Sequence, residues 1–116
     1  MSEIERKYKL YVHISPSNKR YYGITRLDVK KRWGSGGCGY RYQPYIWNAI
    51  QKYGWDNFTH EVLFDNLTED EACLIEQCYI ALYDTMDRTK GYNCSIGGVD
   101  HLHTENTKYK LSEIMM

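Results

Sequence analysis

Apolar and polar residues alternate with a period of two along residues 8–14, and this alternation predicts a half-buried strand. A turn at residues 15–19, which contains a proline, leads into a second strand at residues 20–25. The two strands are predicted to pair as a hairpin. Parity then places Tyr11 and Tyr21 together on the less apolar face, where two neighbouring tyrosines are most simply a cross-strand aromatic pair.

Helical spacing occurs at residues 28–33, 44–53 and 68–83, and residues 58–64 predict a third strand. The first helix has an aspartate at its N-cap, the second begins with a proline, and the third begins with a Thr-x-x-Glu capping box. The glycine-rich run at residues 34–39 is interpreted as a mobile loop. It lacks the Gly-Lys-Ser/Thr ending and the preceding strand of a P-loop, which argues against a kinase or an ATPase. Together these elements predict an α/β (α+β) domain, with a small three-stranded antiparallel sheet flanked by helices.

The chain has 116 residues, which favours a single domain. No apolar run approaches the length of about 20 residues that a membrane span needs, and the N-terminus is charged rather than apolar. We therefore expect a soluble, cytoplasmic protein. The four cysteines form no Cys-x-x-Cys pair, which argues against a structural zinc site and favours reduced thiols.

Charge is unevenly distributed along the chain, although the formal net charge is zero. Residues 19–52, which we call the basic segment, hold eight Lys or Arg and one Asp and so carry +7, whereas the rest of the chain carries −7. Most charged segments are ordinary solvated faces. The basic segment also contains seven Tyr or Trp, and basic groups interleaved with aromatic rings fit a phosphate-rich polymer such as DNA. Lys30, Lys31 and Arg41 are the candidates for contacts with nucleic acid.

Glu76 lies two turns into the predicted helix at residues 68–83, too far from its start to act as a cap. Its helical neighbours are uncharged, and the helix contains no Lys or Arg that would pair with it. Its carboxylate therefore either faces solvent or is complemented by a group from elsewhere.

Five motifs follow one another along residues 8–98: Lys9-Leu10-Tyr11, Tyr21-Tyr22-Gly23, Arg32, Glu76 and Gly91-Tyr92-Asn93. In this order and at this spacing they resemble the GIY-YIG nuclease domain. The first triplet keeps only the tyrosine of its signature, and the second keeps the tyrosine and the glycine. The resemblance therefore depends on the ordered set rather than on any one triplet.

The resemblance implies an endonuclease that hydrolyses DNA phosphodiester bonds. Glu76 corresponds to the family's metal-binding carboxylate, and Mg²⁺ (or Mn²⁺) is the expected cofactor because Mg²⁺ takes one or two carboxylates together with water and phosphate oxygens. Arg32 corresponds to the arginine that binds the scissile phosphate. Tyr11 and Tyr21 correspond to the tyrosines that orient the attacking water, and one of them acts as general base if the metal and nearby cations lower its pKa. Two further matches support the site: Gly23 permits close approach of the backbone, and Asn93 supports the site from outside.

One position departs from the family pattern. Many members have a histidine between the arginine and the glutamate, but this chain has none before His60, which belongs to the predicted third strand. Tyr40 or Tyr42 fills that position in our interpretation, and Tyr42 is preferred because it stands just before the second helix. His13 shares the strand face of Tyr11 but is not a motif position.

Residues 103–113 are similar to the start of the small DNA-binding motifs that follow the nuclease domain in many homing endonucleases, and a capped amphipathic helix end is the alternative. We therefore expect a nuclease domain at residues 1–98 and a tail at residues 99–116. A homing endonuclease of a phage or mobile element in a bacterial host is the expected setting. A restriction or repair nuclease on the same fold, a non-catalytic DNA-binding module and a protein-interaction domain are the alternatives.

Overall fold

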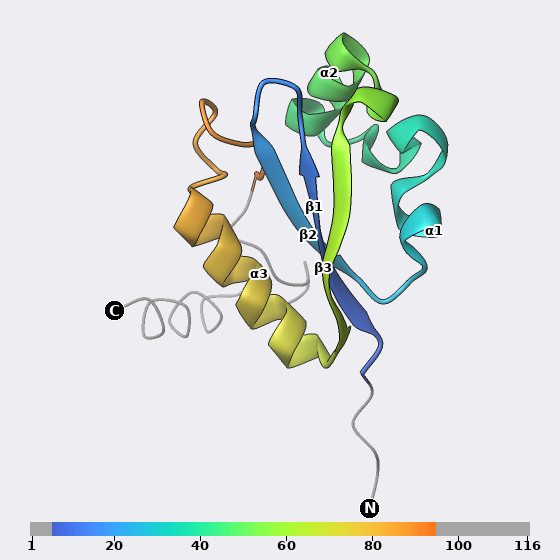
Figure 1. Ribbon diagram of the computed structural model, residues 1–116, viewed down its shortest axis with the longest axis vertical. Coiled ribbons are helices and arrows are strands. Elements are labelled where there is room, and N and C mark those ends of the chain that lie inside the picture. The colour runs from blue at the N-terminus through green and yellow to red at the C-terminus, as the bar shows by residue number, and fades with distance from the viewer. Residues whose placement is uncertain (1–5, 95–116) are drawn as a thin grey trace, which may run out of the picture.

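The computed structural model describes residues 6–94, which form an α+β fold (Figure 1). It confirms the predicted three-stranded antiparallel sheet and its flanking helices. No helix within this range is long and apolar enough to cross a membrane. The predicted boundary at residue 98 and the tail after it lie outside the described residues. The elements in chain order are β1 (Tyr8–Ile14), β2 (Arg20–Thr25), α1 (Val29–Trp33), the 3₁₀ segment η1 (Ser35–Tyr40), α2 (Pro44–Tyr53), the 3₁₀ turn η2 (Trp55–Asn57), β3 (Thr59–Leu67) and α3 (Glu69–Tyr83).

β1 is the central strand of the sheet, with β2 on one side and β3 on the other. In the β1–β2 hairpin, His13 pairs with Tyr21 and Tyr11 pairs with Gly23. The predicted hairpin is therefore confirmed. Tyr11 and Tyr21 belong to one buried cluster, as their parity predicted.

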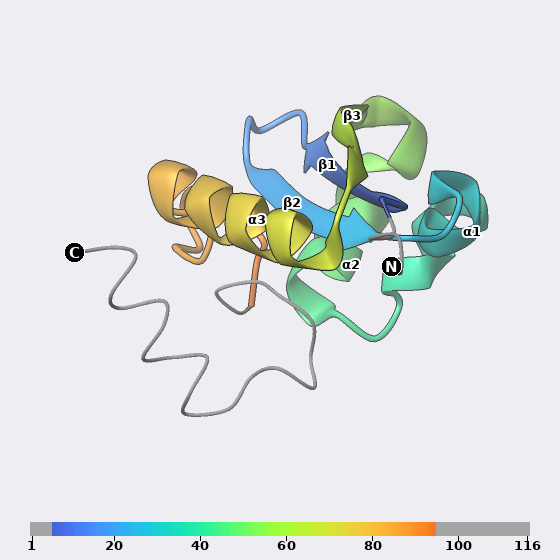
Figure 2. The same ribbon diagram turned by 90° about the horizontal axis from the view of Figure 1, so that it is seen from below.

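β1 is buried on both faces, so the prediction of a half-buried strand is wrong. Tyr11 is 1% exposed and packs in one cluster with Ile46 and Ile50 of α2, whereas Val12 is 2% exposed and packs in another cluster with Ile80 of α3. Figure 2 shows why: α3 lies along one side of the sheet, and α1 and α2 lie along the other. A tyrosine has a polar tip but a large apolar ring, so a face that contains tyrosines can still be core.

Local signals set the helix ends as predicted. Asp28 caps α1, because its Oδ1 accepts a hydrogen bond from the Lys30 amide at 2.9 Å. Thr68 caps α3: its hydroxyl accepts from the Glu71 amide at 3.1 Å, and Oε1 of Glu71 accepts from the Thr68 amide at 2.9 Å. α2 begins at Pro44 and ends before a glycine. These contacts satisfy amide groups that a helix leaves unpaired at its start.

The glycine-rich run at residues 34–39 is not the loop that the sequence predicted, because most of it belongs to η1. Gly36 and Gly37 have φ values of 61° and 78°, in the left-handed region that favours glycine. A β-carbon on Gly39 would overlap the carbonyl oxygen of Arg32. The glycines thus allow η1 to fold closely against α1.

The segment that follows α3 returns to the outer edge of β2, where the Tyr92 amide donates to the carbonyl of Arg20 at 3.0 Å. The buried Asn93 side chain pairs with both backbone groups of Tyr22: Nδ2 donates to the carbonyl at 2.8 Å, and Oδ1 accepts from the amide at 3.0 Å. Oδ1 also accepts from the Thr85 hydroxyl at 2.8 Å. Asn93 therefore satisfies the backbone of β2 on the side that no other strand of residues 6–94 covers.

We expect Asn93→Ala to lower the free energy of unfolding by about 3 kcal/mol, because the buried amide and carbonyl of Tyr22 lose their partner. Urea denaturation measures this change. Asn48→Ala is the matched control, since Asn48 is exposed on α2, and it should change the free energy of unfolding by less than about 0.5 kcal/mol. Equal changes in the two variants would contradict the role given to Asn93.

Candidate active site

Tyr11 of β1 and Gly23 of β2 are direct cross-strand partners, and this pairing positions the Tyr11 ring. A β-carbon on Gly23 would lie 2.5 Å from the Tyr11 hydroxyl oxygen. Only glycine therefore leaves room for the ring to lie across β2. Gly23 was expected to permit a close approach of the backbone. In the structure, the group that lies against Gly23 is the Tyr11 side chain.

Tyr21 lies opposite His13 and donates its hydroxyl proton to Oε1 of Gln43 at 3.0 Å. Its ring meets the Tyr40 ring edge-on, with 5.2 Å between the ring centres. Tyr11, Tyr21 and Tyr40 are all buried on the α2 side of the sheet, and we call these three residues the tyrosine cluster. Tyr11 and Tyr21 are thus brought together, with Tyr40 beside them.

Arg32 reaches the tyrosine cluster from α1. Its guanidinium carbon lies 4.7 Å from the centre of the Tyr40 ring, and its Nη1 donates to the carbonyl oxygen of Gly39 at 3.3 Å. Burial lowers the pKa of Arg32, but its interactions with Tyr11, Tyr40 and Tyr21 raise it by more, so the guanidinium stays cationic. The side chain is partly exposed, which leaves it accessible to an anion from solution.

Glu76 of α3 is 6% exposed and acts on the same tyrosines. Burial raises the pKa of Tyr11 and of Tyr21 above the usual value for a phenol, and the negative charge of Glu76 raises both further. The positive charge of Arg32 lowers the pKa of both, but by less than burial raises it. The charges of Glu76 and Arg32 therefore act in opposite directions on Tyr11 and Tyr21.

The expected lowering of a tyrosine pKa is not found within the protein itself. Burial is the largest effect on each member of the tyrosine cluster, and it raises the pKa of all three. A buried phenolate is unfavourable because its charge loses the solvation that water provides. None of these tyrosines therefore stands ready as a phenolate base at neutral pH.

The structure brings Tyr40, and not Tyr42, into the cluster. Tyr40 is fully buried, and its hydroxyl oxygen lies 3.1 Å from that of Tyr11 and 2.7 Å from Nε2 of His13. Tyr42 is 83% exposed, with the Arg41 guanidinium 4.7 Å from its ring centre. The buried position beside Tyr11 therefore belongs to Tyr40, because η1 turns Tyr40 inward while Tyr42 follows it on the surface, and we prefer Tyr40 over Tyr42 in the proposal below.

A chain of hydrogen bonds leads from the tyrosine cluster to β3. Nε2 of His13 contacts the Tyr40 hydroxyl, and Nδ1 of His13 lies 2.8 Å from Nδ1 of His60. Nε2 of His60 lies 2.9 Å from the carbonyl oxygen of Trp55. We call Tyr11, Tyr40, His13 and His60 the hydrogen-bond chain. It begins at a buried phenol and ends at a partly exposed imidazole.

The Trp55 carbonyl, at the His60 end of the hydrogen-bond chain, determines which atom donates in each of the bonds. The Trp55 carbonyl only accepts, so Nε2 of His60 donates. A neutral His60 then accepts at Nδ1, which makes His13 a donor at Nδ1 and an acceptor at Nε2, where the Tyr40 hydroxyl donates. A protonated His60 reverses these bonds, and Tyr40 then donates to Tyr11, the direction that the hydroxyl geometry favours. In going from the state with neutral His60 to the state with protonated His60, one proton moves across each hydrogen bond, from donor to acceptor.

The predicted nucleic-acid contacts lie on the surface beside Arg32. Lys30 and Lys31 are exposed on α1, and Arg41 is exposed directly after η1. α1 and η1 contact each other, so these cations and Arg32 occupy one side of the domain. Asn93 lies away from the hydrogen-bond chain, at the edge of β2.

Sequence reasoning missed His60 and Gln43 and left His13 aside. A signal for His13 existed, because it shares strand parity with Tyr11. The partners of His60 and Gln43 are set by the pairing of β1 with β3 and by the packing of the residue before α2. No short-range pattern encodes those contacts.

The buried imidazoles make stability depend on pH. Burial lowers the pKa of His13 and of His60, and the neighbouring His60 and Arg32 lower that of His13 further. The unfolded chain therefore takes up protons below about pH 6.5 that the folded protein does not, so stability falls with falling pH. We expect a slope of up to about 1.4 kcal/mol per pH unit from His13, with a smaller, solvent-screened part from His60.

Urea denaturation between about pH 7 and pH 5 measures this slope. His13→Gln should remove most of it, whatever its effect on absolute stability, and His60→Gln should remove less. A slope that is the same in His13→Gln and in the native chain would show that other groups cause it.

No protein-family model matches the chain, and no curated protein or solved structure proved similar to it.

Proposed function

We propose that the domain is a divalent-metal-dependent endonuclease that hydrolyses phosphodiester bonds of DNA. The observation that carries the proposal is the convergence of five chemically distinctive residues from five different elements. A structural core gains little from a partly buried guanidinium and a buried carboxylate whose charges act on the same phenols, because desolvated charges destabilise it. The five are Tyr11 of β1, Tyr21 of β2, Arg32 of α1, Tyr40 of η1 and Glu76 of α3.

Arg32 is the residue that would bind the scissile phosphate. Its guanidinium is cationic, partly exposed and stacked over Tyr40 at 4.7 Å, which limits its movement. A fixed guanidinium stabilises the extra negative charge that develops on a phosphate as water attacks it. Lys30 and Lys31 on the same helix would contact neighbouring phosphates.

The residues present fit one Mg²⁺ or Mn²⁺ ion at Glu76. Glu76 is buried, and its charge acts on Tyr11 and Tyr21, and residues 6–94 contain no group of three or more His, Cys, Asp or Glu that could form an all-protein cage. Mg²⁺ commonly binds through one or two carboxylates, with water and phosphate oxygens as its other ligands. When bound, the ion supplies Lewis-acid stabilisation of the phosphate and a more acidic water.

The hydrogen-bond chain provides a route for the proton that the attacking water releases. The route starts from the state with neutral His60, in which Tyr11 donates to Tyr40, the reverse of the Tyr40-to-Tyr11 bond in this structure. As the new P–O bond forms, the bond from phosphorus to the leaving 3′-oxygen breaks, and that oxygen takes a proton from solvent water to become the 3′-hydroxyl. The proton of the attacking water passes to the Tyr11 oxygen, and the Tyr11 proton passes to Tyr40. Tyr40 passes its proton to Nε2 of His13, whose Nδ1 proton moves to Nδ1 of His60. Each phenol receives a proton as it releases one, so no phenolate forms. This agrees with the raised pKa of the buried tyrosines.

The biological setting that we propose is that of a homing endonuclease, as the motif resemblance implies. A restriction or repair nuclease on the same fold is the nearer alternative, and a test of sequence-specific cutting with added DNA-binding regions separates the two. The 5′-phosphate and 3′-hydroxyl ends that the family produces are the expected products. A net charge of zero implies weak DNA affinity for this domain by itself.

A non-catalytic DNA-binding module is the second candidate, and the depth of the tyrosine cluster favours it. Its three members are no more than 7% exposed, as core residues commonly are. A binding module would use the exposed cations of the basic segment and leave the phenols as packing. It predicts salt-dependent DNA affinity without any metal-dependent cleavage.

A nicking assay on supercoiled plasmid, at low salt with Mg²⁺ or Mn²⁺, distinguishes these candidates. We expect the native chain to relax the plasmid, and Arg32→Ala and Glu76→Gln each to reduce the rate by at least about 100-fold. Arg26→Ala and Glu61→Gln are the matched controls, because both residues are exposed and the changes in charge are the same. An intact plasmid with both metals, together with a shift of the same DNA on a gel, would favour the binding module.

The same assay tests the assignment of Tyr40. Tyr40→Phe removes the hydroxyl that joins Tyr11 to His13 and should slow nicking by about 100-fold, while circular dichroism shows that the fold is kept. Tyr42→Phe removes an exposed hydroxyl and should leave the rate unchanged. The reverse order of effects would restore Tyr42 as the functional tyrosine.

A further inference from the structure

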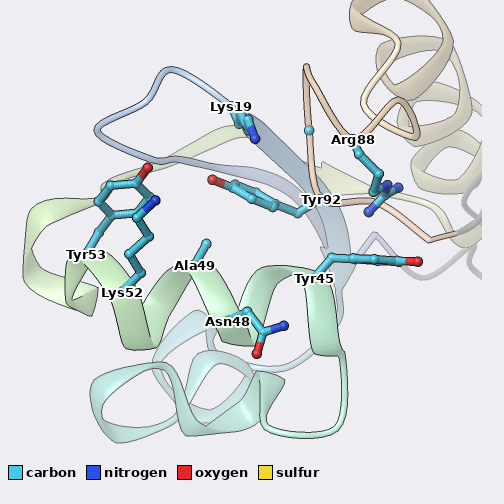
Figure 3. Close-up of a pocket in the computed structure, with 9 residues that line it drawn as sticks. Lys19, Tyr45, Asn48, Ala49, Lys52, Tyr53, Arg88 and Tyr92 are labelled. Carbon is cyan, nitrogen blue, oxygen red and sulfur yellow. The ribbon is translucent and has the colours of Figure 1, made fainter.

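A second concave site lies between α2 and the segment that follows α3 (Figure 3). Its volume is about 320 Å³, at the lower end of the range for ligand pockets. Its walls come from three parts of the chain: the turn between β1 and β2, helix α2, and residues 88–92. No described residue of its lining belongs to the hydrogen-bond chain.

Each of the three parts contributes a cation to the pocket: Lys19 from the turn, Lys52 from α2 and Arg88 from the last segment. The described lining contains no Asp or Glu. Positive groups arranged around a concavity focus their field within it. In a protein of zero net charge, this arrangement favours an anion that carries more than one charge, such as a phosphate.

Three tyrosine rings and Asn48 complete the polar lining, and each cation lies near one of the rings. Figure 3 shows the cations and rings around the space above α2. A ring face close to a cation is a ready surface for a nucleobase, since bases stack on aromatic side chains and on guanidinium planes. The pairs, measured from the charged group to the ring centre, are Arg88 with Tyr45 at 3.9 Å, Lys52 with Tyr53 at 5.2 Å and Lys19 with Tyr92 at 6.0 Å.

Arg88 also has a hydrogen-bond donor without a partner. Its Nε and Nη2 donate to the carbonyl of Met86 at 3.2 and 2.7 Å, and Nη2 also donates to the carbonyl of Asn93. These bonds fix the guanidinium in the pocket wall. Nη1 is buried and has no acceptor within the described residues.

We propose that this pocket binds one nucleotide of DNA, with its phosphate among the three cations and its base against a tyrosine ring. The volume suits a single nucleotide and excludes a duplex. The proposal takes DNA as the ligand from the proposed nuclease function, but binding at this pocket requires neither a metal nor cleavage. A free mononucleotide and a nucleotide within a single strand present the same chemistry to the site.

Isothermal titration of the full chain in EDTA tests the proposal. The probes are 2′-deoxyadenosine 5′-monophosphate, 2′-deoxyadenosine, inorganic phosphate and a short 5′-phosphorylated oligothymidylate. We expect the monophosphate to bind at least about tenfold more tightly than the nucleoside or phosphate, because each of those lacks one half of the interaction. Equal affinity for phosphate and the monophosphate would overturn the nucleotide assignment.

Variants locate the binding. The double change Lys19→Gln and Lys52→Gln, and separately Tyr45→Ala, should each weaken monophosphate binding by at least about tenfold. Lys90→Gln is the control for charge, since Lys90 lies in the same segment but pairs with Asp84 at 3.2 Å. Tyr42→Ala is the control for the ring, since Tyr42 also lies beneath an arginine but outside the pocket. Unchanged affinity in the lysine double variant would overturn the proposal.

Further outcomes distinguish a free mononucleotide from a DNA strand as the ligand, and the pocket proposal from the proposed nuclease function. Binding of the oligothymidylate but not of the monophosphate, with the same response to the variants, supports the pocket as a site for a DNA strand. Glu76→Gln should lose plasmid nicking and keep nucleotide affinity. Failure of nicking in the native chain, with nucleotide binding intact, would reject the nuclease and retain the pocket, whereas absence of binding by every probe rejects the pocket.

Discussion

The burial of β1 on both faces is the constraint on which the rest of the domain depends. Successive side chains of a strand point to opposite sides, so Val12 packs toward α3 while His13 enters the core on the side of α2. A fully buried imidazole is stable only if both of its nitrogens have partners. Tyr40 and His60 supply them, and each needs a further partner of its own: the Tyr11 hydroxyl for one, and the Trp55 carbonyl for the other. The hydrogen-bond chain follows from placing one histidine in the middle of the sheet.

The same burial sets the chemistry that the tyrosine cluster is able to perform. Desolvation makes a phenolate costly, and the Arg32 charge offsets only part of that cost. A general base that must hold a full negative charge is therefore disfavoured, whereas a base that releases one proton while it receives another remains possible. Gly23 and Gly39 support this arrangement because they have no side chain and so leave room for their neighbours. One lets the Tyr11 ring lie across β2, and the other lets η1 pack against the backbone of Arg32.

Short-range features of the sequence predicted the hairpin, the caps at Asp28 and Thr68 and the start of α2, because each depends on residues a few positions apart. The failures concern contacts between distant segments. The choice between Tyr40 and Tyr42 depended on how the glycine-rich run bends, which the left-handed residues of η1 decide. The pairing of His13 with His60 depends on the register between β1 and β3, which shifts near Leu10. Arg32 and Glu76 were assigned to one site through a family resemblance, since nothing in the spacing of the two residues implies it, and in the structure both charges act on Tyr11 and Tyr21.

Helix α2 stands between the two candidate sites and connects their chemistry. Its buried face, with Ile46 and Ile50, packs beneath the tyrosine cluster, while its exposed Tyr45 and Lys52 line the pocket. Both sites draw their cations from the basic segment or, for Arg88, from the segment that lies against β2. A DNA strand with one nucleotide in the pocket would therefore meet further basic groups as it continues toward Arg32. Because the acidic remainder of the chain cancels this charge at long range, any attraction of such a strand would be local to the exposed cations and would be screened further by salt.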